Sequence, residues 1–341
     1  PRSTRSRTGA SSVRTRRSAV SASGGVSNTS AIGRVIRHTP GRLAALSALA
    51  ALAVTSCGGP RGDAATRSAT KRPSLPGLCG DLRARVVGRV SDPAATELSG
   101  LVLSRSQRGV LWTHNDSGDS PRIFAFGLDG RLLAEVALAG AAAFDWEDIA
   151  AGHRTLWIGD IGDNLARRES VFVYRIAEPR VGGDAPATTT AHASAIELRY
   201  PDGPRDAEAL LRDPVSGALV IVSKSATGRS GIYVASRPSP GGATTMRRRG
   251  RLRLGAGEEV TAGDVSADGR TIVLRTYTSA FAWTRRPGES VAAALRRRPC
   301  TVGARLLAEG QGESLALVAD GRAFYTVPEG TRPALRRYAP G

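Results

Sequence analysis

The sequence is poor in the residues that build metal centres from sulfur and imidazole. It has three cysteines and four histidines in 341 residues, and none of them forms a CxxC pair or a Cys/His cluster. A structural zinc site needs such a cluster, so we expect no zinc. The motifs GxSxG, GxxxxGK(S/T) and HExxH are absent as well. The chain therefore shows no signature of an α/β-hydrolase, a P-loop protein or a zinc protease.

Long apolar runs are missing too. A membrane-spanning helix needs about 20 apolar residues, whereas residues 43–54 offer twelve small or apolar ones. Basic residues precede this run and Val-Thr-Ser follows it, which is the order of a secretory signal, here at 35–57. Cys57 follows directly and resembles the lipidated cysteine of a bacterial lipobox; an ordinary signal peptide with an incidental cysteine is the alternative. We expect an extracytoplasmic lipoprotein, anchored to the outer face of the cell membrane.

Lysine is almost absent, although the net charge is +18. Lys71 and Lys224 are the only lysines. Residues 1–57 carry nine arginines and no acid, and the rest holds 39 basic against 30 acidic residues. Arginine in place of lysine, with abundant alanine and glycine, indicates a high-GC, actinobacterial-type composition. The basic clusters at 247–249 and 296–298 lack interleaved aromatics, so we expect solvated outer strands and no nucleic-acid partner.

Composition also sets the domain boundaries. Residues 1–34 are rich in Ser, Arg, Thr and Gly without an acid, so they cannot bury a core. The only methionine is Met246, which suggests that 1–34 is an over-extended reading frame. Residues 58–80 read as a flexible tether, and 81–341 as the folded domain. If Cys57 is lipidated, Cys79 and Cys300 remain, and outside the cytoplasm such a pair normally forms a disulfide.

The folded part contains a repeat of short strands. Five segments share one pattern, in which a polar or acidic residue is followed by small and apolar residues, a turn and a β-rich strand. They begin at Ser99, Glu147, Glu208, Asp264 and Glu313, with spacings of 48, 61, 56 and 49 residues. Such spacings predict four-stranded, WD40-like blades of an all-β propeller. The fifth repeat stops after its third strand, 333–338, and the N-terminal run 83–90 supplies its outer strand. We expect five blades, with six as the alternative.

The first strand of each blade lines the central channel of a propeller. The five repeat-starting residues are therefore expected around one axis, and the residues two positions earlier point the same way. Together the two rings carry seven carboxylates: Glu97, Asp145, Glu147, Asp206, Glu208, Asp264 and Glu313. Carboxylates so close together either have raised pKa values or bind a cation. All-oxygen ligands favour Ca²⁺; acids in a water-filled channel without a specific metal are the alternative.

The loops after the second strands open on the same face and are rich in polar residues. Carboxylates, amides and bases gathered there are typical of a polar-ligand site, and tight turns are the alternative. The candidate ligand-binding residues are Asn115, Asp116, Asp160, Asp163, Asn164, Lys224, Arg275 and Glu329. Lys224 and Arg275 are expected to hold an anion such as phosphate near the cation. His114 is the candidate general base, with a structural histidine as the alternative.

Four motifs carry a family resemblance. They are Glu97-Leu-Ser-Gly-Leu, Gly109-Val-Leu-Trp-Thr-His-Asn-Asp, Ile123-Phe-Ala-Phe-Gly-Leu-Asp-Gly and Asp145-Trp-Glu-Asp-Ile-Ala. The chain resembles the SdiA-regulated propeller family and the related esterase-like, phytase-type secreted propellers, best over 97–150 and loosely over 82–341. The resemblance implies an exported β-propeller with a cation in the channel. A phytase would need a cluster of phosphate-binding basic residues, for which only Lys224 and Arg275 are candidates.

Two functional classes follow. One is a membrane-anchored propeller that binds a polar small molecule or a cell-envelope partner on its acidic, calcium-binding face. The other is a Ca²⁺-dependent hydrolase of a phosphate or carboxylate ester, which needs a metal-activated water near His114 or an acid. The binding class is favoured because no nucleophile motif is present. Whether the protein is an enzyme stays open.

Overall fold

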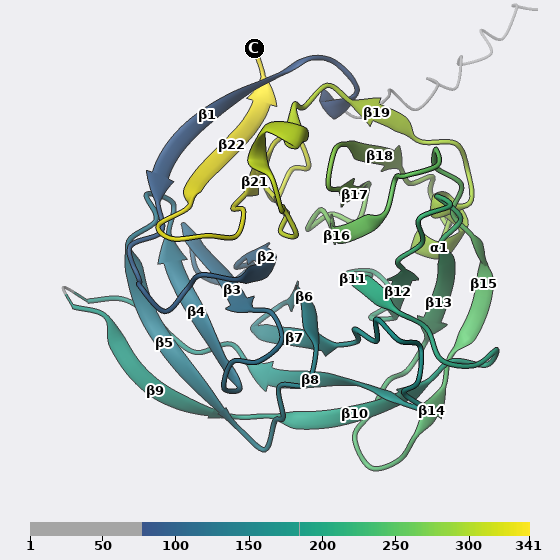
Figure 1. Ribbon diagram of the computed structural model, residues 1–341, viewed down its shortest axis with the longest axis horizontal. Helices are drawn as coiled ribbons and strands as arrows, with labels where there is room; N and C mark the ends of the chain where they lie inside the picture. The colour runs from purple at the N-terminus through teal and green to yellow at the C-terminus, as the bar shows by residue number, and fades with distance from the viewer. Residues whose placement is uncertain (1–76, 184) are drawn as a thin grey trace, which may run out of the picture. The chain divides into compact units, whose positions relative to one another are not determined.

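The computed structural model describes residues 77–183 and 185–341. The segment 1–34, the signal at 35–57 with Cys57, and most of the tether lie outside the described residues. No helix in the described part is long and apolar enough to cross a membrane. The described chain forms five small sheets around a central axis (Figure 1), so the prediction of an all-β, five-bladed propeller is confirmed.

Each blade starts with a strand beside the axis and ends at the rim. Blade 1 contains β2 (Leu98–Leu103), β3 (Val110–Asn115), β4 (Arg122–Gly127), β5 (Leu132–Ala139) and β9 (Ala187–His192). Blade 2 contains β6 (Trp146–Gly152), β7 (Thr155–Asp160), β8 (Val171–Ala177), β10 (Ser194–Arg199) and β14 (Thr244–Thr245). Blade 3 contains β11 (Ala207–Arg212), β12 (Leu219–Ser223), β13 (Gly231–Ala235) and β15 (Arg247–Arg251). Blade 4 contains β16 (Val260–Val265), β17 (Thr271–Thr276), β18 (Ala280–Thr284) and β19 (Cys300–Val302). Blade 5 contains β20 (Ala316–Leu317), β21 (Phe324–Thr326), β22 (Ala334–Pro340) and β1 (Leu82–Arg89).

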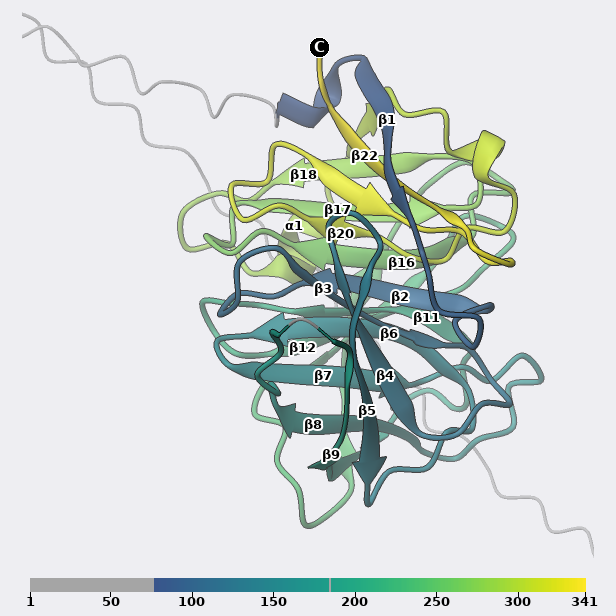
Figure 2. The same cartoon turned by 90° about the vertical axis from the view of Figure 1, so that its left-hand side faces the viewer.

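The ring closes where the two ends of the chain meet. β1 pairs antiparallel with β22 as the outer strand of blade 5, which is the predicted closure (Figure 2). A disulfide joins Cys79 to Cys300, with their Cα atoms 5.6 Å apart. Leu78 is fully buried in the core between blades 4 and 5. Gly77–Cys79 form a short 3-10 turn, so the last residues of the expected tether belong to the propeller.

Apolar side chains fill the space between neighbouring blades. The core consists of five clusters, one for each pair of adjacent blades. Trp112 of blade 1 and Trp146 of blade 2 are almost completely buried in the same cluster. Each blade thus buries both of its faces, and a ring closed in this way leaves no unpaired blade.

Asp-Gly turns join the strands within the blades. In the β4–β5 turn, Gly130 has a φ of +82°, and a Cβ there would lie 2.3 Å from the carbonyl oxygen of Arg89. Only glycine meets both conditions. The Asp129 carboxylate accepts the N–H of Arg131 and fixes the turn.

Three elements differ from the expectation of four-stranded blades without helices. β9 adds to blade 1 in parallel with β5, and β14 adds to blade 2 in parallel with β10. A short helix α1 (Val291–Leu295), capped by Ser290, packs between blades 3 and 4. The sequence repeat predicts the fourth strand of blade 4 at 302–308. The observed strand β19 ends at Val302, because the chain then turns into a 3-10 segment (Leu306–Glu309). That segment places Glu309 in the interior, where it pairs with Arg275.

Candidate functional site

The first strands of blades 1 to 4 carry a β-bulge near the end that faces the loops after the second strands. In β6 the bulge lies between Trp146 and Asp148, and in β11 between Ala207 and Ala209. Glu147 and Glu208 are therefore the extra residues of their strands, and a bulge re-aims its side chain. We call this end of the propeller the channel face.

The bulge in β16 shows that one residue of the predicted ring is misaligned. It lies between Val260 and Ala262, so Thr261 is the counterpart of Glu147, and Asp264 lies three residues further along. The Asp264 carboxylate accepts the N–H groups of Val265 and Leu317 inside the channel. Burial raises its pKa to about 6, although the positive charge of Arg105 acts to lower it. Asp264 is thus a link between blades 4 and 5 and does not join the other carboxylates.

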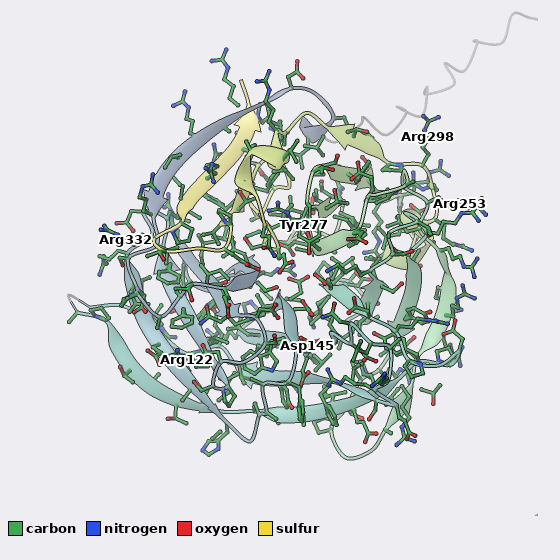
Figure 3. All side chains as sticks on the ribbon, in the orientation of Figure 1. Arg122, Asp145, Arg253, Tyr277, Arg298 and Arg332 are labelled. Carbon is green, nitrogen blue, oxygen red and sulfur yellow. A yellow bond between two sulfur atoms is a disulfide. The ribbon has the colours of Figure 1, made fainter. Side chains whose placement is uncertain are left out.

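Three buried glutamates converge on the axis. Glu147, Glu208 and Glu313 are 2%, 3% and 5% exposed, and one carboxylate oxygen of each lies within 4.8 Å of the others. Asp116 and Asp145 form a second such group with Glu147, and Asp116 forms a third with Glu313 and Glu329. We call these six residues the acidic cluster: Asp116, Asp145, Glu147, Glu208, Glu313 and Glu329. Asp145 and Tyr277 lie close to the centre of the ring (Figure 3).

Burial and mutual repulsion raise the pKa values of five acids in the cluster, which are Asp116, Asp145, Glu147, Glu208 and Glu329. The pKa of Glu147 lies well above its usual range, because of burial first and the charge of Glu208 next. Burial raises the pKa of Glu208 to about 8 although Lys224 opposes the shift. The pKa of Asp116 rises to about 6 and that of Glu329 to about 7, again mainly through burial. The cluster therefore holds protons at neutral pH unless a cation takes their place.

Only part of this acidity is neutralised by side chains. Lys224 donates to Glu208 and to the Tyr277 hydroxyl, which donates to Glu313 Oε1 at 2.7 Å. Glu147 Oε2 and Glu208 Oε2 are buried, and neither has a hydrogen-bond partner among the residues that the structure describes. Gly162 borders the same space, since a Cβ there would lie 2.1 Å from Glu147 Oε1 and 2.5 Å from Asp145 Oδ2. Two unpartnered buried oxygens within a group of converging carboxylates are a geometry that a hard cation fits.

The remaining predicted ring residues flank the acidic cluster. The backbone carbonyls of Glu97, Asp145, Asp206 and Gln311 each accept an N–H from the loop after the second strand of the same blade. This regular pairing shows that the four positions are equivalent. By the same register, the counterpart in blade 4 is Glu259. The sequence repeat, counted back two positions from Asp264, predicts Ala262 there instead. The Asp206 carboxylate accepts the N–H of Asp163 at 3.0 Å, so its Oδ1 links two loops.

Several predicted ligand residues instead hold the loops in shape. Asp160 pairs with Arg168 at 2.7 Å and accepts the N–H of Asp145. Asp163 accepts the N–H groups of Arg167 and Arg168. The Asn115 side chain bonds Ala94, Asp119 and the Glu97 N–H. Asn164 is exposed. Of the loop residues, Asp116, Lys224 and Glu329 lie at the acidic cluster.

His114 is buried away from solvent. Its Nδ1 lies 2.9 Å from the Asn115 carbonyl oxygen, and its ring packs edge-on against Trp146. Burial lowers its pKa to about 4, so the ring is neutral at physiological pH. A base without access to solvent does not fit the role of general base at the channel face.

Arg275 is also placed differently from the prediction. It is completely buried, donates to Glu309 at 3.2 Å and donates to the Ser314 carbonyl. Glu309 accepts in addition from Thr326 and Tyr338. Arg275 thus joins blades 4 and 5 internally, and it does not form an anion site with Lys224, whose ammonium is held by Glu208.

Two residues of the channel were missed from the sequence. Tyr277 lies between Lys224 and Glu313, where it relays a hydrogen bond. Asp148 is fully buried and accepts the N–H groups of Ile149, Leu210 and Gly263, which joins blades 2, 3 and 4. The signal for Asp148 was the Glu147-Asp148 pair itself, since a bulge turns two neighbouring side chains toward the channel.

Comparisons with known proteins add little beyond the fold. No family model matches the chain, and no curated protein matches its sequence. Among solved structures, one similar chain is a putative 6-phosphogluconolactonase from Bacteroides uniformis. It is 15% identical with a TM-score of 0.39, and the match covers 74% of this chain and 68% of that one. The propeller architecture therefore rests on the strands and sheets of this chain itself.

Proposed function

We propose that the protein is an exported binding propeller whose acidic cluster holds a hard divalent cation, of the Ca²⁺ class, at the channel face. In this proposal the bound cation, together with the flanking loops, presents a charged site to a polar ligand or cell-envelope partner. The observation that carries the proposal is the pair of buried, unpartnered oxygens on Glu147 and Glu208.

The charge balance supports a cation. Six carboxylates surround the axis, and Lys224 is the one basic side chain paired with them among the described residues. Protonation is the competing way to neutralise the acids, as the raised pKa values of Glu208 and Glu329 indicate. A divalent cation removes the same repulsion and also fills the open coordination of the two unpartnered oxygens. Ca²⁺ takes six to eight oxygen ligands, which three glutamates and water together supply.

Binding is favoured over hydrolysis by what the site lacks. His114 has no access to solvent, and Arg275 is committed to Glu309. One observation favours the hydrolase as a second candidate: Glu329, partly exposed at the cluster, has a pKa of about 7, as a general acid or base needs near neutral pH. Ca²⁺-dependent turnover of a nitrophenyl phosphate or acetate, lost in Glu329→Gln, would establish that second candidate.

Membrane anchoring belongs to the proposal as well. It rests on the signal-like order of residues at 35–57 and on Cys57 after Val-Thr-Ser. The Cys79–Cys300 disulfide supports an oxidising compartment. Replacing Cys57 with serine is expected to release the protein from the membrane fraction. Membrane association that persists in Cys57→Ser, without lipid mass on the wild type, would contradict the anchor and leave the cation site untouched.

Thermal unfolding with different metals tests the cation site. Ca²⁺ at about 100 times its Kd stabilises a protein by ~2.7 kcal/mol, which is a rise of about 5–10 °C in Tm for a domain of this size. Zn²⁺ at the same concentration is expected to give a smaller shift, because the site has no nitrogen or sulfur ligand.

The double variant Glu147→Gln/Glu208→Gln should abolish the Ca²⁺-dependent shift. A matched control is Glu197→Gln on the rim strand β10, which removes a carboxylate but lies outside the cluster. The control should keep the full shift. An equal Ca²⁺ response in the double variant and the wild type would refute the site.

A further inference from the structure

Arginines gather on one side of the ring, at the outer strand of blade 3. Two adjoining cavities lie there, of about 330 Å³ and about 700 Å³, and both are lined by Arg248 and Arg251. Arg205 and Arg229 line the smaller cavity, and Arg253 and Arg296 line the larger one. Because the two cavities share residues, they form one continuous surface, which we call the arginine track. Arg253 lies at the rim of the ring (Figure 3).

A β-bulge organises this surface. Tyr233 of β13 pairs with Arg248, and Ile232 pairs with Gly250, so Arg249 is the extra residue of β15. Side chains alternate along a strand. Without the bulge, Arg248 and Arg251 would point to opposite faces, and the extra residue brings them to the same face. Arg247 and Arg249 line neither cavity.

Glycine at 250 completes the surface. Its φ is +129°, and a Cβ there would lie 2.7 Å from Arg296 Cδ. The missing side chain therefore allows Arg296 to lie across β15 beside Arg251. Exposed like charges repel one another, so the close approach of Arg296 to this strand favours an anion that neutralises both.

Most of these guanidinium groups are free. Within residues 77–183 and 185–341, the side chains of Arg229, Arg251, Arg253 and Arg296 form no ion pair and no hydrogen bond. Among the described residues, Asp202 is the one acid paired with arginines of the track, through Arg205 at 3.1 Å and Arg248 at 3.4 Å. None of the residues that line the two cavities is acidic.

We propose that the arginine track binds a linear, phosphate-bearing polyanion that lies along both cavities. Guanidinium groups bind phosphate oxygens in a planar, two-pronged geometry, and several of them in a row fit repeated phosphates better than a single ion. The track offers no stacking platform: Tyr233 is its only aromatic lining residue and is 1% exposed. Single-stranded nucleic acids rely on aromatic stacking, so a phosphate chain without bases fits this surface better.

The track reaches the channel face at one end. Lys224 lines the smaller cavity and also pairs with Glu208 of the acidic cluster. A polyanion on the track would thus end beside the proposed cation. Binding of a polyanion to the track does not require the cation, because the free arginines lie on a different surface of the propeller from the converging glutamates.

Binding of linear polyphosphate of defined length, measured by calorimetry in EDTA, tests the proposal. EDTA removes divalent cations, so the result is independent of the acidic cluster. Affinity is expected to rise with chain length and to fall steeply with salt, as for other polyanion sites. Arg251→Gln/Arg253→Gln should weaken binding by roughly tenfold or more, since charge-assisted hydrogen bonds are lost.

The matched control is Arg247→Gln/Arg249→Gln, which removes the same charge from the same strand on residues that line neither cavity. It should weaken binding by no more than about twofold to threefold, the range of a screened surface charge. Equal losses in both double variants would overturn the proposal in favour of diffuse attraction. Two other results would also overturn it: orthophosphate that binds as tightly as the chain, or a single-stranded oligonucleotide of equal charge that binds more tightly than polyphosphate. Unchanged Tm values in all variants verify that folding is intact.

Discussion

The disulfide that closes the ring allows a quantitative prediction. Cys79 and Cys300 are separated by 221 residues, so the covalent loop contains blades 1 to 3 and most of blade 4. In the chain-entropy model, a loop of this length lowers the entropy of the unfolded chain by an amount worth about 5 kcal/mol at 25 °C. The double variant Cys79→Ala/Cys300→Ala is therefore expected to lose up to about 5 kcal/mol of unfolding free energy.

The expected change in melting temperature follows from the size of the domain. For large domains, each 1 kcal/mol shifts Tm by about 2–4 °C, so the variant should melt about 10–20 °C lower than the wild type. Circular dichroism at about 217 nm, near the usual minimum of a β-sheet spectrum, measures the loss of strands. A reductant should lower the Tm of the wild type to that of the variant and leave the variant unchanged.

Two outcomes would refute this reasoning. One is a wild-type Tm that does not change although thiol titration shows that both cysteines are reduced. The other is an equal drop on reduction in the double variant, which would place the effect elsewhere in the chain. Cys300 also packs against the core between blades 4 and 5, so the single variant Cys79→Ala separates the loss of the covalent bond from the loss of that packing.

The remaining predictions concern the channel. First, the pKa values of Asp116, Glu329 and Glu208 are raised to about 6, 7 and 8, so the folded state holds more protons than the unfolded state above pH 4. The Tm measured in EDTA should therefore fall as the pH rises from about 4 to 8. Saturating Ca²⁺ should remove that fall. Second, Gly162→Ala places a Cβ against Glu147 and Asp145, so calorimetry should show that the Ca²⁺ affinity is at least about tenfold weaker. The control is Gly242→Ala, whose added Cβ meets no atom within 4 Å, and it should not change the Ca²⁺ affinity. Third, Glu309→Gln leaves Arg275 as an unpaired buried charge, and urea unfolding should show a loss of about 3–5 kcal/mol; an unchanged midpoint would contradict the buried pair.

The architecture was predictable because it repeats. Spacings near 50 residues and Asp-Gly turns indicate blades, and an incomplete fifth repeat indicates closure by the N-terminal strand, which β1 and β22 form. Pairing of Cys79 with Cys300 followed from these being the only two cysteines after Cys57. The propeller is thus encoded by local patterns that recur, and recurrence makes each of them easier to identify.

Details that depend on a single inserted residue were not predictable from the repeat. The alignment placed Asp264 with Glu147, but the bulge in β16 makes Thr261 the counterpart. A bulge adds one residue to a strand but needs no particular residue type there. A pattern of apolar and polar residues therefore does not reveal its position. The same limit applies to Arg249, whose extra place in β15 aligns Arg248 with Arg251.

Partners of buried charges were also hidden in the sequence. Arg275 lies near the end of the second strand of blade 4, and Lys224 directly follows the second strand of blade 3, so the two looked equivalent. In the structure Arg275 turns inward to Glu309, because a 3-10 segment replaces the end of the expected outer strand and carries that acid into the interior. Such a pair joins residues 34 positions apart, and neither local propensity nor periodicity identifies it.

A crystal structure of the protein grown with Ca²⁺ at neutral pH tests the central claim most directly. The account predicts one strong peak of density on the channel axis, within 2.3–2.6 Å of oxygens from Glu147, Glu208 and Glu313, the range of Ca²⁺–oxygen bonds. The Oε2 atoms of Glu147 and Glu208, which lack partners, should be among its ligands. A channel that holds only water, with the three glutamates at hydrogen-bonding distance from one another, would contradict the account and show that protons neutralise the acidic cluster.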